Sequence, residues 1–177
     1  MRLDAHQHFW NYTENAADFV WMTDDLGVLQ HNFLPADLAP LLAAANMDGC
    51  IAVQAREVQA ETDFLLELAA SNPTIKGVVG WVDLCARDVE ALIEPYSDTP
   101  ALKGFRMDHI AKPKMDGSDW EAWHFGMQEI AKRPNVLCKL SGLVTEADWS
   151  DWQASSFTPY LDTVLEAFGA NRLMIGS

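Results

Sequence analysis

The sequence Leu-Asp-Ala-His-Gln-His-Phe-Trp, residues 3–10, decides how the rest of the chain is interpreted. Alternate side chains of a strand share one face, so Asp4, His6 and His8 point together while the residues between them point the other way. Two imidazoles spaced in this way can grip one metal ion or one substrate. A pair of hydrogen-bonded structural histidines is the alternative. Because the pair stands at the C-terminal end of the predicted strand, we favour a binding site there.

Strand-like and helix-like segments alternate along the whole chain. This alternation is typical of repeated βα units around a parallel sheet. The predicted strands are residues 3–9, 50–54, 75–83, 102–110, 136–141 and 172–176. The predicted helices between them are residues 35–46, 61–71, 118–133 and 158–169.

A parallel sheet of this kind is either a doubly wound open sheet or a closed barrel. The first strand ends in chemically capable side chains instead of leading into a Gly-rich phosphate loop, which favours the barrel. A complete (β/α)8 barrel of the TIM type has eight strands and about 250 residues. Here 177 residues hold about six recognisable strands. The sequence therefore predicts an incomplete (β/α)8 TIM-type barrel, in a single domain over residues 1–177.

The composition is that of an ordinary globular domain, with 49% hydrophobic and 21% charged residues. A formal net charge of -14 argues against nucleic acid or a membrane surface as a partner, because phosphate neutralisation needs clustered Lys and Arg.

The N-terminus has no apolar signal segment and no apolar run is long enough to cross a bilayer, so we expect a cytoplasmic protein. Cys50, Cys85 and Cys138 have no disulfide or zinc spacing, and we expect buried or partly buried thiols.

Motifs of several other enzyme classes are absent from the sequence. It contains no G-x-S-x-G elbow, no Walker loop, no G-x-G-x-x-G and no H-E-x-x-H. Serine hydrolases, nucleotide binders and the common zinc proteases therefore lose support. We expect no organic cofactor.

Beyond residues 3–10, the chain holds a series of ordered motifs. They are Val-Gln-Ala-Arg (53–56), Gly-Val-Val-Gly-Trp-Val-Asp (77–83), Lys-Gly-Phe-Arg (103–106), Asp-His-Ile-Ala-Lys-Pro (108–113), Cys-Lys-Leu-Ser-Gly (138–142) and Arg-Leu-Met-Ile-Gly-Ser (172–177). With the first segment, they resemble the L-fuconolactonase-like branch of the amidohydrolase family over nearly the whole chain. The resemblance implies a (β/α)8 barrel that opens sugar lactones or related cyclic esters with water. Some relatives use a divalent metal ion and others do not.

The chain departs from this family pattern in two places. In the family a further βα unit separates the Gly-Phe-Arg motif from the Asp-His motif, whereas here Arg106 is followed at once by Met107 and Asp108. Similar proteins also continue past the position of Ser177 into an Asp-Trp-Pro motif whose aspartate shuttles protons. We therefore expect weak or no lactonase activity from these residues, and self-association through the open edges of an incomplete sheet.

The resemblance and the positions at strand ends together indicate the site residues. His6, His8 and His109 are the expected catalytic residues, and His6 and His8 the expected ligands of one divalent ion, zinc or manganese. Cations at strand ends can polarise a lactone carbonyl or hold a hydroxyl group, and an indole can stack on a sugar face. The expected substrate-binding residues are Trp10, Gln54, Arg56, Arg106, Lys112 and Lys139. Each of these cations could equally be a solvated loop charge, and the indole a packing residue.

The leading hypothesis is a hydrolase that opens a sugar lactone, similar to L-fuconolactone, or a related cyclic ester. The histidines and the cationic side chains, directly or through a metal, would polarise the carbonyl, and a carboxylate at the last strand would activate water. A metal-dependent amidohydrolase or decarboxylase on the same barrel is the alternative among enzymes. From a different class, the chain is a non-catalytic remnant of a barrel. The expected partner of the enzyme is a small molecule.

Overall fold

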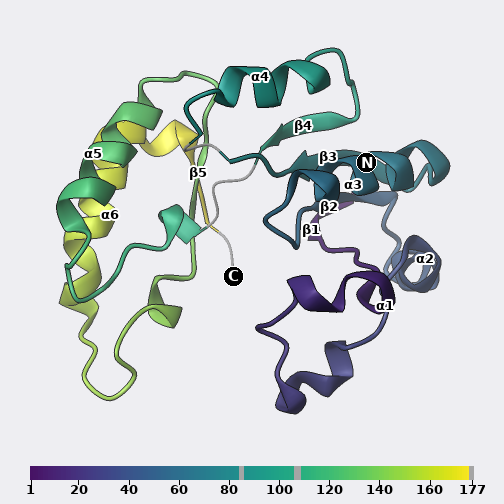
Figure 1. Ribbon diagram of the computed structural model, residues 1–177, viewed down its shortest axis with the longest axis horizontal. Coiled ribbons are helices and arrows are strands. Elements are labelled where there is room, and N and C mark those ends of the chain that lie inside the picture. The colour runs from purple at the N-terminus through teal and green to yellow at the C-terminus, as the bar shows by residue number, and fades with distance from the viewer. Residues whose placement is uncertain (84–85, 106–108, 176–177) are drawn as a thin grey trace. The chain divides into compact units, whose positions relative to one another are not determined.

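The computed structural model describes residues 1–83, 86–105 and 109–175. The chain forms two compact units, Met1–Arg106 and Met107–Ser177. Each unit has its own strands, helices and hydrophobic core, and Figure 1 labels the main elements.

The first unit is built on a four-stranded parallel sheet. Its strands are β1 (Leu3–Gln7), β2 (Gly49–Val53), β3 (Ile75–Gly80) and β4 (Leu102–Phe105). They pair in the order β1-β2-β3-β4, so each strand lies beside the one that precedes it in the sequence (Figure 1). A doubly wound sheet reverses its strand order at a switch point, whereas a barrel does not. The observed order is therefore that of a barrel segment.

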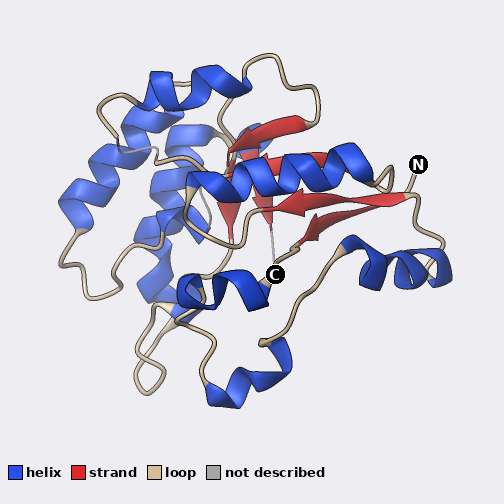
Figure 2. Cartoon of the chain, turned by 45° about the vertical axis from the view of Figure 1, so that its right-hand side comes forward, coloured by secondary structure: helices blue, strands red, loops and turns tan. Residues whose placement is uncertain are grey.

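Helices fill the connections that parallel strands require. Between β1 and β2 lie α1 (Tyr12–Asn15), the 3-10 helices η1 (Ala16–Asp18) and η2 (Asp24–Leu29), and α2 (Pro35–Ala44). Helix α3 (Gln59–Ser71) connects β2 to β3 and lies against the sheet (Figure 2). Between β3 and β4 stand α4 (Val89–Ile93) and the 3-10 helix η3 (Glu94–Tyr96).

The contact between α3 and β3 is close because Gly80 has no side chain. A Cβ atom on Gly80 would lie 2.6 Å from the Oγ1 atom of Thr62. That hydroxyl donates a hydrogen bond to the carbonyl of Trp81 and accepts one from its N–H, both at 2.8 Å. The helix is thereby fastened to the C-terminal end of β3. The apolar core beside it consists of Phe9, Cys50, Ala52, Leu65, Ile75 and Val78.

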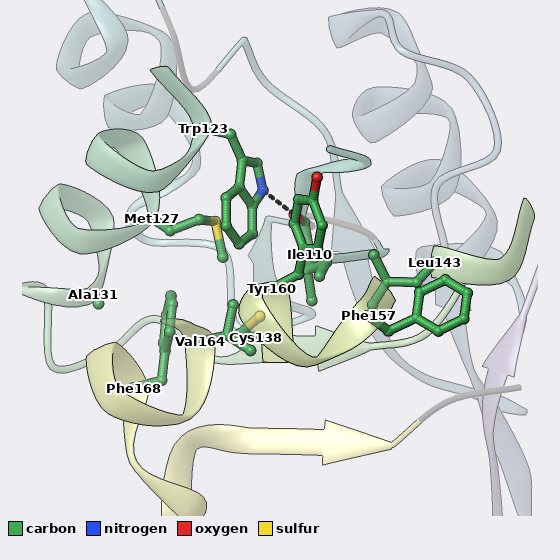
Figure 3. Packing of buried hydrophobic residues seen from close by; sticks show 10 residues of the cluster. All are labelled: Ile110, Trp123, Met127, Ala131, Cys138, Leu143, Phe157, Tyr160, Val164 and Phe168. Carbon is green, nitrogen blue, oxygen red and sulfur yellow. Dashed lines mark hydrogen bonds between the residues drawn. The ribbon is translucent and has the colours of Figure 1, made fainter. Parts of the chain in front are cut away.

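The second unit holds a parallel pair of strands and two longer helices. Strand β5 (Cys138–Leu140) pairs with β6 (Leu173–Ile175), and the helices are α5 (Trp120–Ala131) and α6 (Ala154–Phe168). Three 3-10 turns complete the unit: η4 (His109–Ala111), η5 (Leu143–Thr145) and η6 (Ala170–Arg172). Figure 3 shows the enclosed core, made of Ile110, Trp123, Met127, Ala131, Cys138, Leu143, Phe157, Tyr160, Val164 and Phe168.

All six predicted strands occur; most predicted boundaries differ from the observed ones by one to three residues, and two differ by more. Of the strand predicted over residues 102–110, the structure shows Leu102–Phe105 as a strand, while residues 106–108 lie outside the described residues. His109 and Ile110 have a left-handed backbone that a strand cannot contain, so the prediction is wrong there. The helix predicted to begin at Thr158 begins at Ala154. Phe157 is buried on the inward face of this helix, so core packing places the start before the proline signal.

The described strands form two sheets instead of one. Within residues 1–83, 86–105 and 109–175, no strand pairs with both β4 and β5. Self-association through open sheet edges stays a prediction, as does the organisation of residues 1–177 as one barrel domain.

Among the described helices, none combines the length and the apolar character that crossing a membrane requires.

Two of the three cysteines are fully buried. Cys50 and Cys138 are each 0% exposed, as predicted for buried thiols, while Cys85 lies outside the described residues. Burial raises the pKa of both thiols from 9.0 to about 11, and the negative charge of Asp4 adds to the effect at Cys50. Both thiols therefore stay protonated and unreactive in the folded chain near neutral pH.

These thiols should make the chain less stable in alkali. From pH 9.0 to about 11 the unfolded thiol ionises while the folded one stays protonated, so stability present below this window is lost as pH rises through it. Each thiol contributes a fall of about 1.4 kcal/mol per pH unit. Urea unfolding at a series of alkaline pH values measures the slope, and Cys138→Ala should reduce it by that amount. Equal slopes in the wild type and the variant would contradict this expectation.

Candidate active site

Two imidazoles meet at the C-terminal end of β1. His6 lies within the strand and His8 directly follows its last residue, Gln7. Their Nε2 atoms are 3.0 Å apart and their ring centroids 4.7 Å apart. Both side chains are half-buried. The alternation that predicts a shared face for the two rings is therefore found in the structure.

A backbone carbonyl decides which nitrogen of each ring carries its proton. Nδ1 of His8 lies 2.9 Å from the carbonyl oxygen of Val53, the last residue of β2. A carbonyl only accepts, so neutral His8 is protonated on Nδ1 and its Nε2 is an acceptor. His6 then donates from its Nε2 to the Nε2 of His8. The carbonyl at the end of β2 thus orients the second imidazole of the pair, as outer-shell partners do for metal-binding histidines.

The pair can supply two nitrogen ligands to a divalent ion. Their Nε2 atoms approach each other closely, and imidazole nitrogen suits zinc and other first-row metals. A catalytic zinc site usually has three protein ligands. In the part of the chain that the structure describes, no cluster of three or more His, Cys, Asp or Glu side chains could hold a metal ion. The two histidines therefore fit such an ion as part of its ligand set.

Trp10 is held in an aromatic cluster next to the histidine pair. Its indole N–H donates to the carbonyl of His31 at 2.8 Å, and its backbone forms an antiparallel bridge with Phe33. Its ring centroid lies 4.8 Å from that of Phe33 and 6.0 Å from that of Phe19. These contacts fix the half-buried indole, while its role in stacking on a sugar stays a prediction.

Arg56, just after β2, is the centre of a buried polar network. Its Nε donates to Oε2 of Glu61 at 2.7 Å. Its Nη1 donates to Oδ1 of Asn15 at 2.7 Å and to Oδ2 of Asp18 at 2.9 Å. The other carboxylate oxygen of Glu61 accepts the backbone N–H of Ala55 at 2.9 Å. The network therefore joins the end of β2, the start of α3 and the α1–η1 segment.

The charges in this network offset the burial of the guanidinium. Arg56 is 8% exposed and Glu61 0% exposed, so their ion pair is buried. Burial acts to lower the pKa of Arg56, but the hydrogen bonds and charges of Glu61 and Asp18 outweigh it and raise the pKa above its usual value. The neighbouring Gln54 is buried as well. Their roles in substrate binding stay predictions, and the structure gives Arg56 a role in holding the β1–α2 connection.

In the second unit, His109 begins a left-handed turn. The backbone φ angle is positive at His109, Ile110, Ala111 and Lys112, with values between 45° and 61°. Each such residue costs about 1–3 kcal/mol and persists only where its surroundings hold it. Ile110 supplies that hold, because it is 0% exposed and its carbonyl accepts the indole N–H of Trp123 at 2.7 Å (Figure 3).

The ring of His109 packs against the segment that follows β5. Its Nδ1 atom lies 2.7 Å from the hydroxyl oxygen of Ser141. The next residue, Gly142, has a φ of 70°, and a Cβ atom there would lie 2.5 Å from Nδ1 of His109. The imidazole therefore occupies space that any other residue at position 142 would fill.

The other cations predicted to bind substrate are Lys112, Lys139 and Arg106. Nζ of Lys112 lies 3.8 Å from Oε1 of Glu146, and the Lys112 side chain is 58% exposed. A surface pair of this kind contributes about 0–1 kcal/mol. Lys139 lies in β5 and is half-buried, and Arg106 lies outside the described residues. Substrate binding by these three residues stays a prediction.

Sequence reasoning misses four polar residues of these networks, Asn15, Asp18, Glu61 and Ser141. Ser141 carried a usable signal, since it lies in a motif at the end of a predicted strand, whereas Glu61 is the first residue of a predicted helix. Asp18 carried none, because it lies 38 residues from Arg56 in an irregular connection.

Comparisons with known proteins point to one family. A family model described as amidohydrolase matches residues 105–177. The L-fucono-1,5-lactonase of Burkholderia multivorans is 34% identical over 243 residues, covering 100% of this chain and 81% of the relative. That of Burkholderia ambifaria is 32% identical over 232 residues, covering 99% and 79%. Both matched spans are longer than the 177 residues of this chain, so the relatives hold residues within them that have no counterpart here.

Solved structures give the same result for the fold. The crystal structure of a Burkholderia multivorans amidohydrolase with bound zinc has a TM-score of 0.59 at 34% identity, covering 100% of this chain and 84% of that one. Amidohydrolase 2 from Bifidobacterium longum subsp. infantis has a TM-score of 0.52 at 16% identity, covering 99% and 83%, which shows a similar fold. The predicted (β/α)8-type barrel, incomplete here with six strands described, is confirmed.

The Arg56 network should be important for stability. We expect Glu61→Gln to lower the free energy of unfolding by about 3 kcal/mol, because it leaves the buried guanidinium with too little opposing charge. Urea unfolding at neutral pH measures the loss. Glu67→Gln, on an exposed position of the same helix, is the matched control and should change stability by less than about 0.5 kcal/mol. Equal effects of the two variants would rule out a stabilising role for the buried pair.

Proposed function

The chain belongs to the amidohydrolase family, and on this premise we propose that it is a hydrolase that opens a sugar lactone with water. Similarity to two L-fucono-1,5-lactonases over nearly the whole chain supports this reaction and makes L-fucono-1,5-lactone the first substrate to test. The observation that carries the proposal is the meeting of the His6 and His8 Nε2 atoms at the C-terminal end of β1. Barrel enzymes build their active sites at this end of their strands.

The proposed hydrolysis of a lactone needs few catalytic groups. Water adds to the lactone carbonyl carbon, the bond from that carbon to the ring oxygen breaks, and the ring oxygen takes a proton, which leaves a hydroxy acid. His6, His8 and His109 are the proposed catalytic residues, and a donated hydrogen bond from an imidazole would stabilise the negative charge that develops on the carbonyl oxygen. The proposed substrate-binding residues are Trp10, Gln54, Arg56, Arg106, Lys112 and Lys139.

We also propose that His6 and His8 hold a divalent ion, zinc or manganese, through their Nε2 atoms. Such an ion would polarise the lactone carbonyl as a Lewis acid. The convergence of the two nitrogens supports this assignment, as does the zinc bound to the similar Burkholderia multivorans amidohydrolase. Independently of the ion, the carbonyl of Val53 keeps the second imidazole in one orientation.

Lactone opening, followed by the pH change that acid release causes, tests the function. We expect slow turnover of L-fucono-1,5-lactone and related aldonolactones, because residues within the relatives' matched span are missing here and strand number and stagger set the distances across a barrel. His6→Ala should lower kcat/KM by about 10²-fold or more. His124→Gln, a half-buried histidine on α5 outside the site, should leave turnover unchanged. Rates equal to those of buffer for every lactone would favour the non-catalytic remnant.

Elemental analysis after loading with zinc or manganese tests the metal site. We expect near-stoichiometric but weakly held metal, since two protein nitrogens are fewer than the three ligands of a usual catalytic zinc site. His6→Ala should abolish it and His124→Gln should retain it. Equal and negligible metal in the wild type and His6→Ala would show that the two imidazoles bind substrate without a metal ion.

A further inference from the structure

Two of the three guanidinium nitrogens of Arg56 have hydrogen-bond acceptors in the chain. Nε donates to Glu61 at 2.7 Å, and Nη1 donates to Asn15 at 2.7 Å and to Asp18 at 2.9 Å. Within residues 1–83, 86–105 and 109–175, no residue accepts a hydrogen bond from Nη2. Arg56 is 8% exposed, and a buried donor without an acceptor is rare in a folded protein. The N–H groups of Nη2 are therefore available to a ligand.

Arg172 shows how the same fold satisfies a guanidinium whose role is structural. Its Nε donates to the carbonyl of Phe168 at 3.1 Å, its Nη1 to that of Ala131 at 2.9 Å and its Nη2 to that of Ala167 at 3.3 Å. All three nitrogens thus bind carbonyls at the C-terminal ends of α5 and α6. Arg56 differs in its Nη2 atom, which its structural contacts do not use.

Arg56 stands at the end of the sheet where the histidine pair lies. It follows Val53, the last residue of β2, by three positions, and the carbonyl oxygen of Val53 lies 2.9 Å from Nδ1 of His8. Barrel enzymes bind their substrates at this end of the strands. A ligand held by Nη2 would therefore lie at the rim that carries the imidazoles.

The charges around Arg56 decide which ligand suits its Nη2 atom. The carboxylates of Glu61 and Asp18 both pair with the guanidinium, so one positive and two negative groups give the network a net formal charge of -1. The chain as a whole carries -14. An anionic ligand would add like charge to a buried site, which is costly. An uncharged hydroxyl or carbonyl oxygen accepts a hydrogen bond without that cost.

We propose that Nη2 of Arg56 donates a hydrogen bond to an uncharged oxygen of a sugar lactone, and that the charge of Asp18 disfavours lactones that carry a carboxylate. The proposal rests on the lactonase function and deepens it, because it names neutral polyhydroxylated lactones as the substrate class. It also separates substrate from product. The hydroxy acid that hydrolysis forms is anionic at neutral pH, so the same charge favours its release.

Binding of two matched lactones tests the proposal. L-Galactonolactone has the ring stereochemistry of L-fuconolactone and is uncharged, and the galactarolactone of the same configuration carries a carboxylate in place of its terminal hydroxymethyl group. Ligand-observed NMR on the full chain at neutral pH, without added metal, gives both dissociation constants. We expect the wild type to prefer the neutral lactone. Asp18→Asn keeps an acceptor for Nη1 but removes the charge, so it should narrow the preference about tenfold, as expected for like charges about 10 Å apart.

Asp24→Asn is the matched control for charge. Asp24 is an exposed carboxylate of the same β1–α2 connection, whereas Arg56 pairs with Asp18 and Glu61. The control should keep the wild-type preference. Equal narrowing in the two Asn variants would reveal a general charge effect and overturn the proposal, as would an unchanged preference in Asp18→Asn.

Arginine NMR reports the contact itself. Labelling with 15N-arginine, together with Lys variants at the other arginine positions, identifies the Nε signal of Arg56. L-Galactonolactone should shift this signal and leave that of Arg172 in place. Binding without a shift at Arg56 would overturn this inference alone, whereas binding of neither lactone would overturn the proposed substrate class as well. Neither measurement uses turnover, so a failed lactonase assay leaves both results readable.

Discussion

A hydrogen bond from Nδ1 of His8 to the carbonyl of Val53 connects the ends of two parallel strands, and the geometry of the His6–His8 pair depends on it. It exists because β1 and β2 are adjacent and parallel, so that their C-terminal ends meet at one edge of the sheet. The bond settles the proton positions on both imidazoles of the pair. Three residues beyond Val53, Arg56 starts the buried network that holds the segment after β1 against the same edge.

Local periodicity explains which parts of this arrangement can be predicted from the sequence. The shared face of His6 and His8 follows from a two-residue repeat, and the strand order follows from regular βα alternation. The pairing of His109 with Ser141 spans 32 residues, and nothing in either local sequence specifies it. The left-handed turn at His109 is likewise set by the burial of Ile110, so a run of β-forming residues reads wrongly as one continuous strand.

Arg56 and His109 show that a polar residue at a strand end can have a structural role as well as a substrate-binding one. The protein is strongly acidic, so a buried cation there invites a substrate-binding interpretation. Around Arg56, the carboxylates of Asp18 and Glu61 balance much of the guanidinium charge. The Arg56 side chain thereby holds the segment after β1 to the start of α3. Around His109, the hydroxyl of Ser141 and the space left by Gly142 fix the position of the ring. Arg56 and His109 differ in the side chains that surround them, and the fold brings those side chains from distant parts of the sequence.

The order β1-β2-β3-β4 has a consequence for how the protein is made. Each strand of the first unit pairs with its neighbour in the sequence, so no strand of this sheet has to wait for a partner from the second unit. Domains emerge from the ribosome N-terminal end first. The His6–His8 pair, the carbonyl that orients it and the core beside them all belong to the first unit, so they can assemble while the second unit is still being translated.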